Sequence, residues 1–544
     1  MKILLACPPI TIYKSDTSIL GSVVPLGLAY IASYLEHHLP SDEDFEIKIL
    51  DCGIEPNYEA FPDRTKYGMS DKEISKQLSD FKPDVVGISC AYTAYAMDAH
   101  NFARLTKQFN HNTFVALGGA HCSISPEIEL RDPNIDFAIK GEGEITFLEL
   151  VKSLHKAKND FNHIRGLAYR KNSEIRVNPP REFIKELDKL PFPARHLLPM
   201  EAYINVGLGS SYIRKRVTTM ITSRGCPYQC SFCSIHSVWG YQWRPRSPKN
   251  VVDEIEHLIE KYKIGEVHFV DDNIGVDKKR LRDICLEIMH RGLDVRWATP
   301  NGIAHWLLDE ELVNLMKRAG CYRITLGIES ANYETRKFIG KDTRHKIELD
   351  QAKRIIKYAN AAGMWTISTF ILGFPYEDIT SIRQTIDFAI ASDVDLAVFY
   401  LAGPFPGTKL YDVAKREKLI DWDFSEVYHE SKTSINYEDV AIALGSGGFR
   451  TKYFTREQLQ ELQSMAQKEF MINRARSFLN PVRLYHKINS LEDFNFAVRA
   501  GFSMLKPLLN SIQNKKMDSH TLKRQTTKVL VQSYKGRPQK QQEP

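Results

Sequence analysis

The stretch RGCPYQCSFCSIHSVWG at residues 224–240 decides how the rest of the chain is interpreted. Its cysteines, Cys226, Cys230 and Cys233, form a C-x3-C-x2-C pattern directly after the run VTTMITSRG (217–225), which is typical of a β-strand. Three thiolates on one short loop can hold three irons of a cubane and leave the fourth iron open, as a cluster needs if it must bind and cleave a substrate. The pattern therefore predicts a [4Fe-4S] cluster on this loop.

The same loop allows a second interpretation. The three cysteines together with His236 could form a structural zinc site, because three cysteines and one histidine are an accepted ligand set for zinc. The other six cysteines have no partner spacing, and most of them are expected to be buried, inert thiols. These are Cys7, Cys52, Cys90, Cys122, Cys285 and Cys321.

The sequence around and beyond the loop predicts six strands separated by helical patterns. They are VTTMITSRG (217–225), EVHFVDDN (266–273), VRWATPNG (295–302), RITLGIES (323–330), TISTFILGFP (366–375) and LAVFYLAGPFPG (396–407). Six parallel βα units describe a partial barrel, whose active site belongs at the C-terminal ends of the strands. The helix after the cysteine loop has Ser247 as its predicted N-cap and Pro248 in its first turn.

An earlier α/β series precedes this one. Its predicted strands are KILLAC (2–7), FEIKILDC (45–52), VVGISC (85–90), FVALGG (114–119) and FAIKGEG (137–143), with a helix over 25–39. Five strands and their crossovers make one doubly wound domain. We expect the boundaries 1–150 for this domain, 151–211 for a linker, 212–440 for the barrel, 441–512 for a helical C-terminal cap and 513–544 for a basic, disordered tail.

Charge and hydropathy exclude some function classes. Residues 513–544 carry eight Lys or Arg against two acidic residues, which accounts for the whole net charge of +6. A neutral folded part argues against an enzyme that acts on nucleic acid. No transmembrane segment and no signal peptide are expected, which predicts a cytoplasmic protein. The amphipathic run 494–512 is expected to dock as part of the cap, with peripheral membrane contact as the alternative.

The cysteine loop and the strand exits together resemble the radical S-adenosylmethionine (SAM) superfamily, in which C-x3-C-x2-C follows the first barrel strand and an aromatic residue precedes the last cysteine. Phe232 occupies that aromatic position. The resemblance implies SAM binding by Phe232 and by residues at the exits of later strands. Those residues are Asp271, Asp272, Asn273, Glu329, Ser330, Gly373 and Pro404.

The N-terminal series resembles the cobalamin-binding half of the cobalamin-dependent radical SAM enzymes. The match rests on PLGLAYIASYLE (25–36), PDVVGISC (83–90), LGGAHCS (117–123) and KGEGEITF (140–147). It implies an α/β fold in which a doubly wound, Rossmann-like cobalamin-binding domain precedes a partial (β/α)6 radical SAM barrel and a helical C-terminal region. The implied cobalamin contacts are Gly27, Ser89, Gly118, Gly119, His121, Gly141, Glu142 and Gly143.

Two features limit the cobalamin resemblance. The D-x-H-x-x-G motif that ligates cobalt is absent, because Asp51 is followed by Cys52-Gly53-Ile54 without the histidine. Some relatives bind cobalamin without that histidine. For His121, a satisfied histidine in the core or at the surface is an equally open interpretation.

The resemblance implies a methyltransferase that places a methyl group from methylcobalamin on an unactivated carbon of a small molecule, natural product or lipid, by way of a 5′-deoxyadenosyl radical. Flavodoxin or ferredoxin is the implied electron donor. The run HSVWGYQWRPRS (236–247) is most similar to a subgroup that includes a phosphonate C-methylase. Trp239, Trp243 and Arg244 are possible substrate contacts there, with aromatic packing of the loop as the alternative.

Three other functions stay open. A cobalamin-dependent radical SAM cyclase or rearrangement enzyme would use the same parts. A methylthiotransferase would use Cys7, Cys52 and Cys90 for a second cluster, although their contexts do not fit that family. A corrinoid-binding carrier without enzymatic activity would require a SAM pocket that no longer works.

Overall fold

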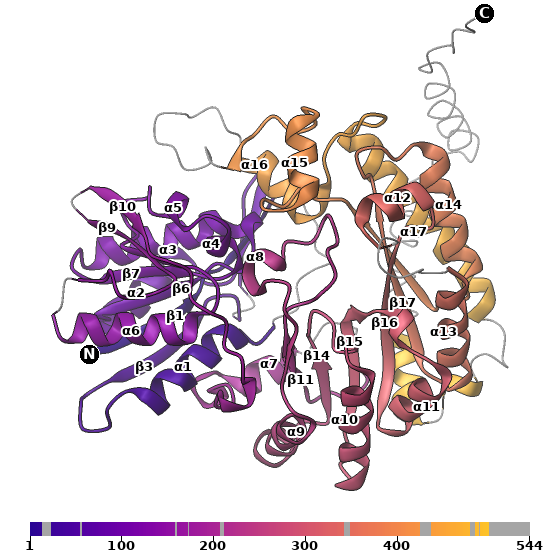
Figure 1. Cartoon of the computed structure of the whole chain (residues 1–544), viewed down its shortest axis with the longest axis horizontal. Helices are drawn as coiled ribbons and strands as arrows, with labels where there is room; N and C mark the ends of the chain where they lie inside the picture. Colours follow the sequence, from indigo (N-terminus) through magenta and orange to yellow (C-terminus); the bar gives the residue numbers. More distant parts are fainter. Residues whose placement is uncertain are drawn as a thin grey trace, which may run out of the picture.

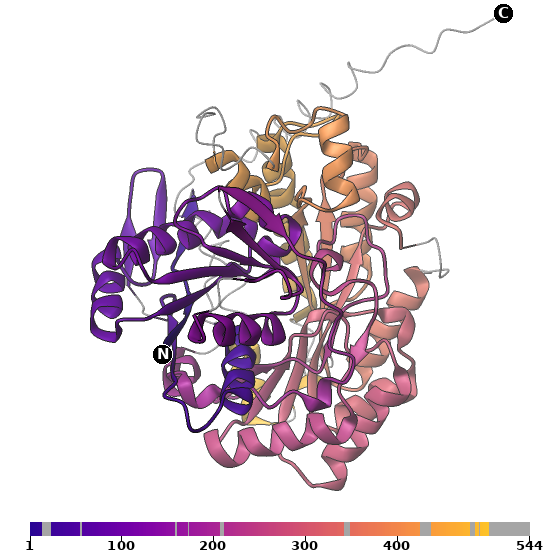
Figure 2. The same cartoon turned by 60° about the vertical axis from the view of Figure 1, so that its left-hand side comes forward.

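The computed structural model describes residues 1–13, 23–54, 57–157, 160–171, 173–206, 212–341, 349–424, 437–478, 485–488 and 490–499. Two sheets organise these residues, one in the N-terminal lobe and one in the barrel beside it (Figure 1). The same two lobes stay adjacent when the molecule is turned (Figure 2). The predicted α/β class and its order of domains are confirmed.

The N-terminal sheet has the strand order β10-β9-β8-β7-β6-β1-β3. Its five parallel strands are β1 (Lys2–Cys7), β3 (Glu46–Asp51), β6 (Val85–Ser89), β7 (Phe114–Gly118) and β8 (Phe137–Ile139). In chain order this is the flavodoxin-like arrangement, which reverses direction between β1 and β6. Ligands of such sheets bind beyond the C-terminal strand ends at that reversal.

Helices cover both faces of this sheet. They are α1 (Leu26–His38), α2 (Asp71–Phe81), η1 (Thr93–Tyr95), α3 (Ala96–Phe109), α4 (Ala120–Ile124), α5 (Pro126–Glu129) and α6 (Gly143–His155). The helix expected over 25–39 is therefore confirmed as α1. Its face formed by Leu28, Ala32 and Leu35 is buried, as the helical spacing of these residues requires.

The structure adds strands that the periodicity of the sequence does not reveal. Within the expected linker, β9 (Leu167–Lys171) and β10 (Glu174–Val177) form an antiparallel extension of the N-terminal sheet. A small separate sheet joins β2 (Ile10–Tyr13), β5 (Arg64–Tyr67) and β4 (Tyr58–Ala60). Every residue of β4 and β10 is exposed, and both strands are too short, at three and four residues, for their periodicity to mark them.

The barrel sheet keeps its six parallel strands in chain order. They are β11 (Val217–Met220), β14 (Glu266–Phe269), β15 (Arg296–Ile303), β16 (Cys321–Glu329), β17 (Trp365–Leu372) and β18 (Leu396–Leu401). All six predicted strands are present. Between β11 and β14, the short strands β12 (Ser223–Arg224) and β13 (Arg244–Pro245) pair with each other and enclose the cysteine loop.

Helices follow the barrel strands. Those between the strands are α9 (Pro248–Tyr262), α10 (Lys278–His290), η4 (His305–Leu307), α11 (Glu310–Arg318), α12 (Tyr333–Ile339), α13 (Leu349–Ala361) and α14 (Ile379–Ala391), whereas α8 (His236–Trp239) lies in the cysteine loop and α15 (Lys409–Arg416) follows β18. Ser247 caps α9, since its side chain accepts a hydrogen bond from the Asn250 N–H, and Pro248 lies in the first turn. The predicted start of this helix is confirmed.

The C-terminal region is helical where the structure describes it. α16 (Tyr437–Ile442) and α17 (Arg456–Phe478) follow the barrel, and α17 packs on α14 and β18. In the segment 490–499, Phe496 is buried against Tyr322 and Trp365, so this part docks on the barrel. The basic tail 513–544 lies outside the described residues. No helix in the described part of the chain is long and apolar enough to cross a membrane.

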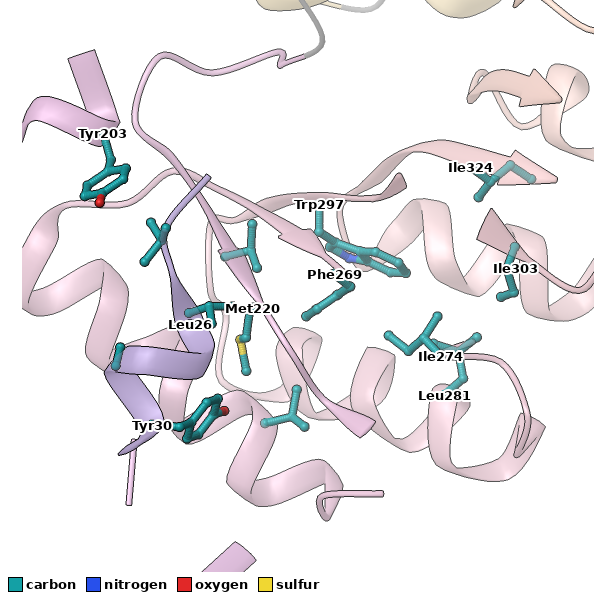
Figure 3. Packing of buried hydrophobic residues seen from close by; sticks show 14 of the residues in the cluster. Leu26, Tyr30, Tyr203, Met220, Phe269, Ile274, Leu281, Trp297, Ile303 and Ile324 are labelled. Atoms are coloured by element: carbon teal, nitrogen blue, oxygen red, sulfur yellow. The ribbon is translucent and has the colours of Figure 1, made fainter. Parts of the chain in front are cut away.

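One buried hydrophobic cluster joins the two lobes. Leu26 and Tyr30 of α1 lie beside Met220 of the first barrel strand, and the cluster continues through Phe269 and Trp297 into the barrel (Figure 3). The linker helix α7 (Met200–Val206) contributes Tyr203 and Ile204 to the same cluster. Apolar burial therefore fixes the first helix of the N-terminal lobe against the edge of the barrel.

Candidate functional site

The cysteine loop is held at both ends and in its middle. Arg224 of β12 pairs with Arg244 of β13, which closes the base of the loop. In the middle, the Ser231 N–H donates to Ile339 O at 3.1 Å, and the Leu410 N–H donates to Ser231 O at 2.8 Å. The loop is thus anchored on α12 and α15, at the C-terminal ends of the barrel strands, where a barrel active site is expected.

Cys226, Cys230 and Cys233 are half-buried on this loop. Burial raises the pKa of the Cys226 thiol to about 11 and that of Cys233 to about 12, and it also raises the pKa of Cys230. Without a metal these thiols hold their protons, whereas bound iron would deprotonate them. Three adjacent thiols with this chemistry fit a cubane cluster bound through three irons.

The zinc interpretation finds less support. Among the described residues, no group of three His, Cys, Asp or Glu side chains converges as around a single metal ion. Zinc needs that convergence, because its four ligands surround one ion. In a cubane each cysteine binds a different iron, so the three sulfurs need not converge on one point. His236 instead stacks on Tyr241, with 4.2 Å between the ring centroids.

The three polar residues at the exit of β14 differ in burial and in the partners of their side chains. Asp271 is buried and accepts hydrogen bonds from the Thr222 and Ser223 hydroxyls at 2.7 and 2.5 Å. Asn273 is buried and caps the Gly275 N–H at 3.2 Å. Only Asp272 remains half-buried, where it accepts from the Gly225 N–H at 3.1 Å beside the cluster loop.

Asp272 is therefore the best acceptor for a cation in this part of the site. Burial, and then the charge of Asp271, raise the pKa of Asp272 to about 7. A carboxylate with few partners in such surroundings gains most from an ammonium group. Its hydrogen bond from the Gly225 N–H leaves acceptor capacity for a ligand amine.

The exit of β16 holds a strained residue and an unexpected lysine. Glu329 has φ 66°, a conformation that a residue other than glycine or asparagine adopts at a cost of about 1–3 kcal/mol. Its Oε1 lies 3.1 Å from Lys341 Nζ, and Lys341 also donates to Gly327 O, at 2.5 Å. Burial raises the pKa of the Cys226 and Cys230 thiols, and the charge of Lys341 offsets part of that rise, so this ammonium belongs to the surroundings of the loop.

Sequence reasoning missed Lys341. It follows the end of α12 rather than a strand, and nothing in its neighbourhood marks a site. Sequence reasoning also missed Glu377, a buried carboxylate that accepts from the Gly373 N–H at 2.9 Å and the Phe374 N–H at 3.1 Å. Glu377 shapes the turn after β17 that contains the predicted residue Gly373, whose φ is 86°.

The other predicted SAM residues lie around the same end of the barrel. Phe232 packs toward Phe374 of the β17 exit, with 6.0 Å between ring centroids. Pro404 is buried after β18. Ser330 is fully buried, bonds to the Thr385 hydroxyl and accepts from the Asn332 N–H, so its side chain already has structural partners.

Glycines leave open room along the rim of the N-terminal sheet. A Cβ added at Gly27 would meet no atom within 4 Å, and one at Gly118 would come no closer than 3.8 Å to Ile139. Ser89, at the end of β6, pairs in register with Gly118. Gly119 has φ 104° and passes so close to Cys90 that any Cβ would clash. Open glycines at the strand ends fit a large flat ligand such as cobalamin.

His121 is fully buried just beyond this rim. Its Nδ1 lies 3.1 Å from the Thr93 hydroxyl and its Nε2 lies 3.1 Å from Glu129 Oε1. Glu129 also bonds to His100, which in turn contacts Asp132. The geometry favours the satisfied core histidine over direct contact with a corrin.

The turn 141–144 faces the barrel with its carboxylates. Glu142 Oε1 accepts from Arg224 at 2.7 Å and from Arg244 at 2.8 Å, and Glu142 Oε2 accepts from the Ile184 N–H at 2.7 Å. Gly141 donates its N–H to the Ser123 hydroxyl at 2.9 Å, which ties the turn to helix α4 after β7. Gly143 lies against Ile31 of α1. The Glu142 side chain is thus engaged by protein groups, and contacts from the backbone of this turn to cobalamin stay a prediction.

The expected substrate contacts are packed within the protein. Arg244 is buried, and its guanidinium lies 4.7 Å from the ring centroid of Phe183. Trp239 lies beneath the guanidinium of Arg224, and Trp243 beneath that of Arg280, at 5.1 and 5.6 Å. These contacts favour the alternative of aromatic packing around the loop.

The remaining cysteines are buried, apart from half-buried Cys7. Burial raises the pKa of Cys7, Cys52 and Cys90 above the ordinary value. Cys52 and Cys90 pack within the hydrophobic core of the N-terminal sheet. The second cluster of a methylthiotransferase gains no support from this arrangement.

Comparisons with known families divide the chain in the same way as the structure. The family model "Radical SAM superfamily" matches residues 220–389, and the model "B12 binding domain" matches residues 16–151. The first match contains the cysteine loop and the exits of β14 to β17. The second contains every residue predicted to contact cobalamin.

Two curated relatives and one solved structure are similar over most of the chain. An uncharacterised methyltransferase of Pyrococcus horikoshii is 34% identical over 87% of this chain and 93% of its own. The cytidylyl-2-hydroxyethylphosphonate methyltransferase of Streptomyces wedmorensis is 32% identical over 88% and 91%. The radical SAM methyltransferase TsrM of Kitasatospora setae, solved with cobalamin and a [4Fe-4S] cluster, matches 77% of this chain and 75% of its own with TM-score 0.61 and 20% identity.

Proposed function

Because the chain belongs to the cobalamin-dependent radical SAM methyltransferases, we propose that the cysteine loop, the exits of the barrel strands and the glycine rim form one methyl-transfer site. The enzyme uses a [4Fe-4S] cluster, SAM and cobalamin. The observation that carries the proposal is the placement of three half-buried thiols on a loop that is anchored on α12 and α15 and whose helix α8 contacts α4 of the N-terminal lobe.

When bound, the cluster and cobalamin supply reductive cleavage of SAM to a 5′-deoxyadenosyl radical and transfer of a methyl group to a substrate carbon. Cys226, Cys230 and Cys233 would hold the cluster. Asp272 would accept from the amine of SAM, and Glu329 would accept from its ribose or methionyl end. Lys341 holds the Glu329 carboxylate in place and adds positive charge near the thiolates.

The remaining residues keep the site dry and in shape. Phe232, Phe338 and Phe374 pack together beside the loop, and an apolar wall of this kind limits access of water to a reactive radical. Glu377 fixes the turn after β17 through two backbone N–H groups. At the rim, Gly27, Ser89, Gly118 and Gly119 would let the corrin approach the backbone.

The substrate is a small molecule. We propose that the methyl acceptor is a carbon without an activating group. The proposed electron donor is flavodoxin or ferredoxin, and the proposed location of the enzyme is the cytoplasm. The ion pairs of Arg244 with Glu142 and of Arg246 with Glu254 engage the arginines near the loop. Because these arginines already have acidic partners, they give no reason to expect a phosphate or carboxylate on the substrate.

The Cys230→Ala variant tests the proposal. After anaerobic purification and reconstitution with iron and cobalamin, wild type is expected to hold about one cubane and one cobalamin per chain. With dithionite and SAM it should form 5′-deoxyadenosine, because the open iron binds SAM. Cys230→Ala should lose iron and 5′-deoxyadenosine but retain cobalamin, and Cys285→Ala, which changes a buried thiol of α10, serves as the control.

The products distinguish the alternatives. S-adenosylhomocysteine formed together with 5′-deoxyadenosine supports methyl transfer, whereas 5′-deoxyadenosine alone in the presence of a converted substrate supports a cyclase or rearrangement. Extra iron without cobalamin would point to a methylthiotransferase. Zinc in place of iron, or cobalamin binding without any SAM cleavage, would contradict the proposed function.

A further inference from the structure

Two acidic residues of the N-terminal lobe bind the two arginines that close the cluster loop. Arg224 Nη1 donates to Glu142 Oε1 at 2.7 Å, and Arg224 Nη2 donates to Glu144 Oε1 at 2.6 Å. Arg244 Nη1 donates to the same Glu142 Oε1 at 2.8 Å. All four side chains are at most 5% exposed, so these pairs are shielded from solvent.

The acidic and the basic residues are both positioned for this contact by their own secondary structure. Glu142 is the N-cap of α6 and Glu144 lies in its first turn, where the helix dipole favours negative charge. Arg224 and Arg244 are direct partners in the β12–β13 ladder, so both guanidinium groups extend from one point of the hairpin.

Aromatic rings complete the junction from both lobes. The guanidinium of Arg224 lies 5.2 Å from the ring of Tyr30 on α1 and 5.1 Å from that of Trp239 on α8. A guanidinium between two rings and two carboxylates has little freedom to move. Removing one carboxylate would leave a buried cation short of a partner, which is costly.

The junction connects the two predicted cofactor sites. Arg224 is separated from the first cluster cysteine, Cys226, only by Gly225, where a Cβ would come within 2.4 Å of Gln242 O. Because a single residue separates Arg224 from Cys226, a displacement of β12 would also displace Cys226. On the other side, the turn with Glu142 is bonded through Gly141 to Ser123, in the helix α4 that follows Gly118 and Gly119.

We infer that Glu142 and Glu144 are positioning residues, which couple the cobalamin rim to the cluster loop through Arg224 and Arg244. The inference rests on the proposed function for the identity of the two cofactors. Its consequence is that cobalamin, once bound, stabilises the cluster loop, and that this effect passes through the buried pairs.

Hydrogen exchange on the full-length protein tests the coupling. In wild type, adding hydroxocobalamin is expected to slow amide exchange in peptides from 223–246 by about fivefold or more, the size of a typical coupling between sites. The double variant Glu142→Gln/Glu144→Gln should bind cobalamin but lose this slowing. Glu149→Gln is the matched control, because Glu149 lies on the same helix and pairs with Arg181 near the surface.

A second measurement and a second variant keep the inference falsifiable. In the reconstituted protein, the electron paramagnetic resonance spectrum of the reduced cluster should differ between samples with and without cobalamin. We expect this difference in wild type and in Glu149→Gln, but not in the double variant. Arg224→Lys keeps the charge but cannot bond to both carboxylates at once, and it should lose the response as well.

Three outcomes would overturn the inference. The double variant could retain the full response to cobalamin, or wild type could hold both cofactors and show no response. If amide exchange in the double variant were faster than in wild type throughout the barrel, including peptides from β17 and β18, the pairs would serve general stability instead. A wild-type chain that takes up neither iron nor cobalamin would contradict the proposed function itself.

Discussion

Glu377 shows how much a single buried carboxylate contributes to the shape of this site. It is 2% exposed and accepts from two backbone N–H groups and, at 3.2 Å, from the Thr335 hydroxyl. Burial nevertheless raises its pKa from the ordinary value of 4.5 to about 7. Between these two values the folded protein holds a proton that the unfolded chain has released, so stability falls as the pH rises through this window.

The Glu377→Gln variant should remove that decline. The amide stays neutral at every pH and still offers an oxygen to the Gly373 and Phe374 N–H groups. Relative to wild type, its free energy of unfolding in urea should therefore improve between about pH 5 and about pH 8. Glu377→Ala should instead cost about 1–3 kcal/mol at both pH values, because two buried donors lose their acceptor. Parallel pH profiles of wild type and Glu377→Gln would contradict this prediction.

At the scale of elements, the strand ends of the N-terminal sheet determine where a ligand fits. β6 and β7 end side by side at Ser89 and Gly118, and the backbone after Gly118 turns away through a residue with φ 104°. Because the room above Gly118 is bounded by no protein atom closer than 3.8 Å, a larger side chain there meets the ligand rather than the fold.

Gly118→Val should accordingly weaken cobalamin binding by about tenfold or more, a loss of about 1.4 kcal/mol. Valine suits a strand, and the position has no positive φ, so the melting temperature should change little. Spectrophotometric titration with hydroxocobalamin measures the affinity. Phe114→Val, at the opposite end of the same strand, serves as the control, and equal affinities of the two variants would place cobalamin elsewhere.

At the scale of the whole molecule, the end of the described chain closes the bottom of the barrel. Lys487 is 1% exposed and donates to Asn360 Oδ1 and Met364 O, each at 2.8 Å, and to Asp395. Asp395 also accepts from the Thr366 N–H at 2.8 Å, at the start of β17. The C-terminal segment therefore supports the barrel at the end opposite the cluster loop.

Lys487→Met should destabilise the protein by about 3–5 kcal/mol, because it leaves Asp395 buried without its cation. Adding Asp395→Asn should restore part of the loss, since the remaining side chain is then neutral. Thermal unfolding of both variants, with Lys249→Met at an exposed pair as the control, measures the effect. A double variant no more stable than Lys487→Met would show that the pair does not act as one unit.

Local sequence determined the order of the elements and the place of the cluster loop. The strands of both lobes, the helix that begins at Ser247 and the three cysteines could be predicted because periodicity, capping and ligand spacing involve neighbours along the chain. The edge strand β10 escaped prediction, since four residues without a buried face are too few to establish a period. The family resemblance depended on the same local motifs, and both its cofactors and its fold were confirmed.

Only the tertiary structure decided which side chains meet. Glu142, expected at the cobalamin site, pairs with Arg224 across 82 positions, and Lys487 pairs with Asp395 across 92. Asp271 and Asp272 are neighbours with different partners, because successive residues at a strand end face opposite sides. Charges that are distant along the chain carry no local pattern. Their pairing depends on how the two lobes pack, which is decided by apolar surface buried over the whole molecule.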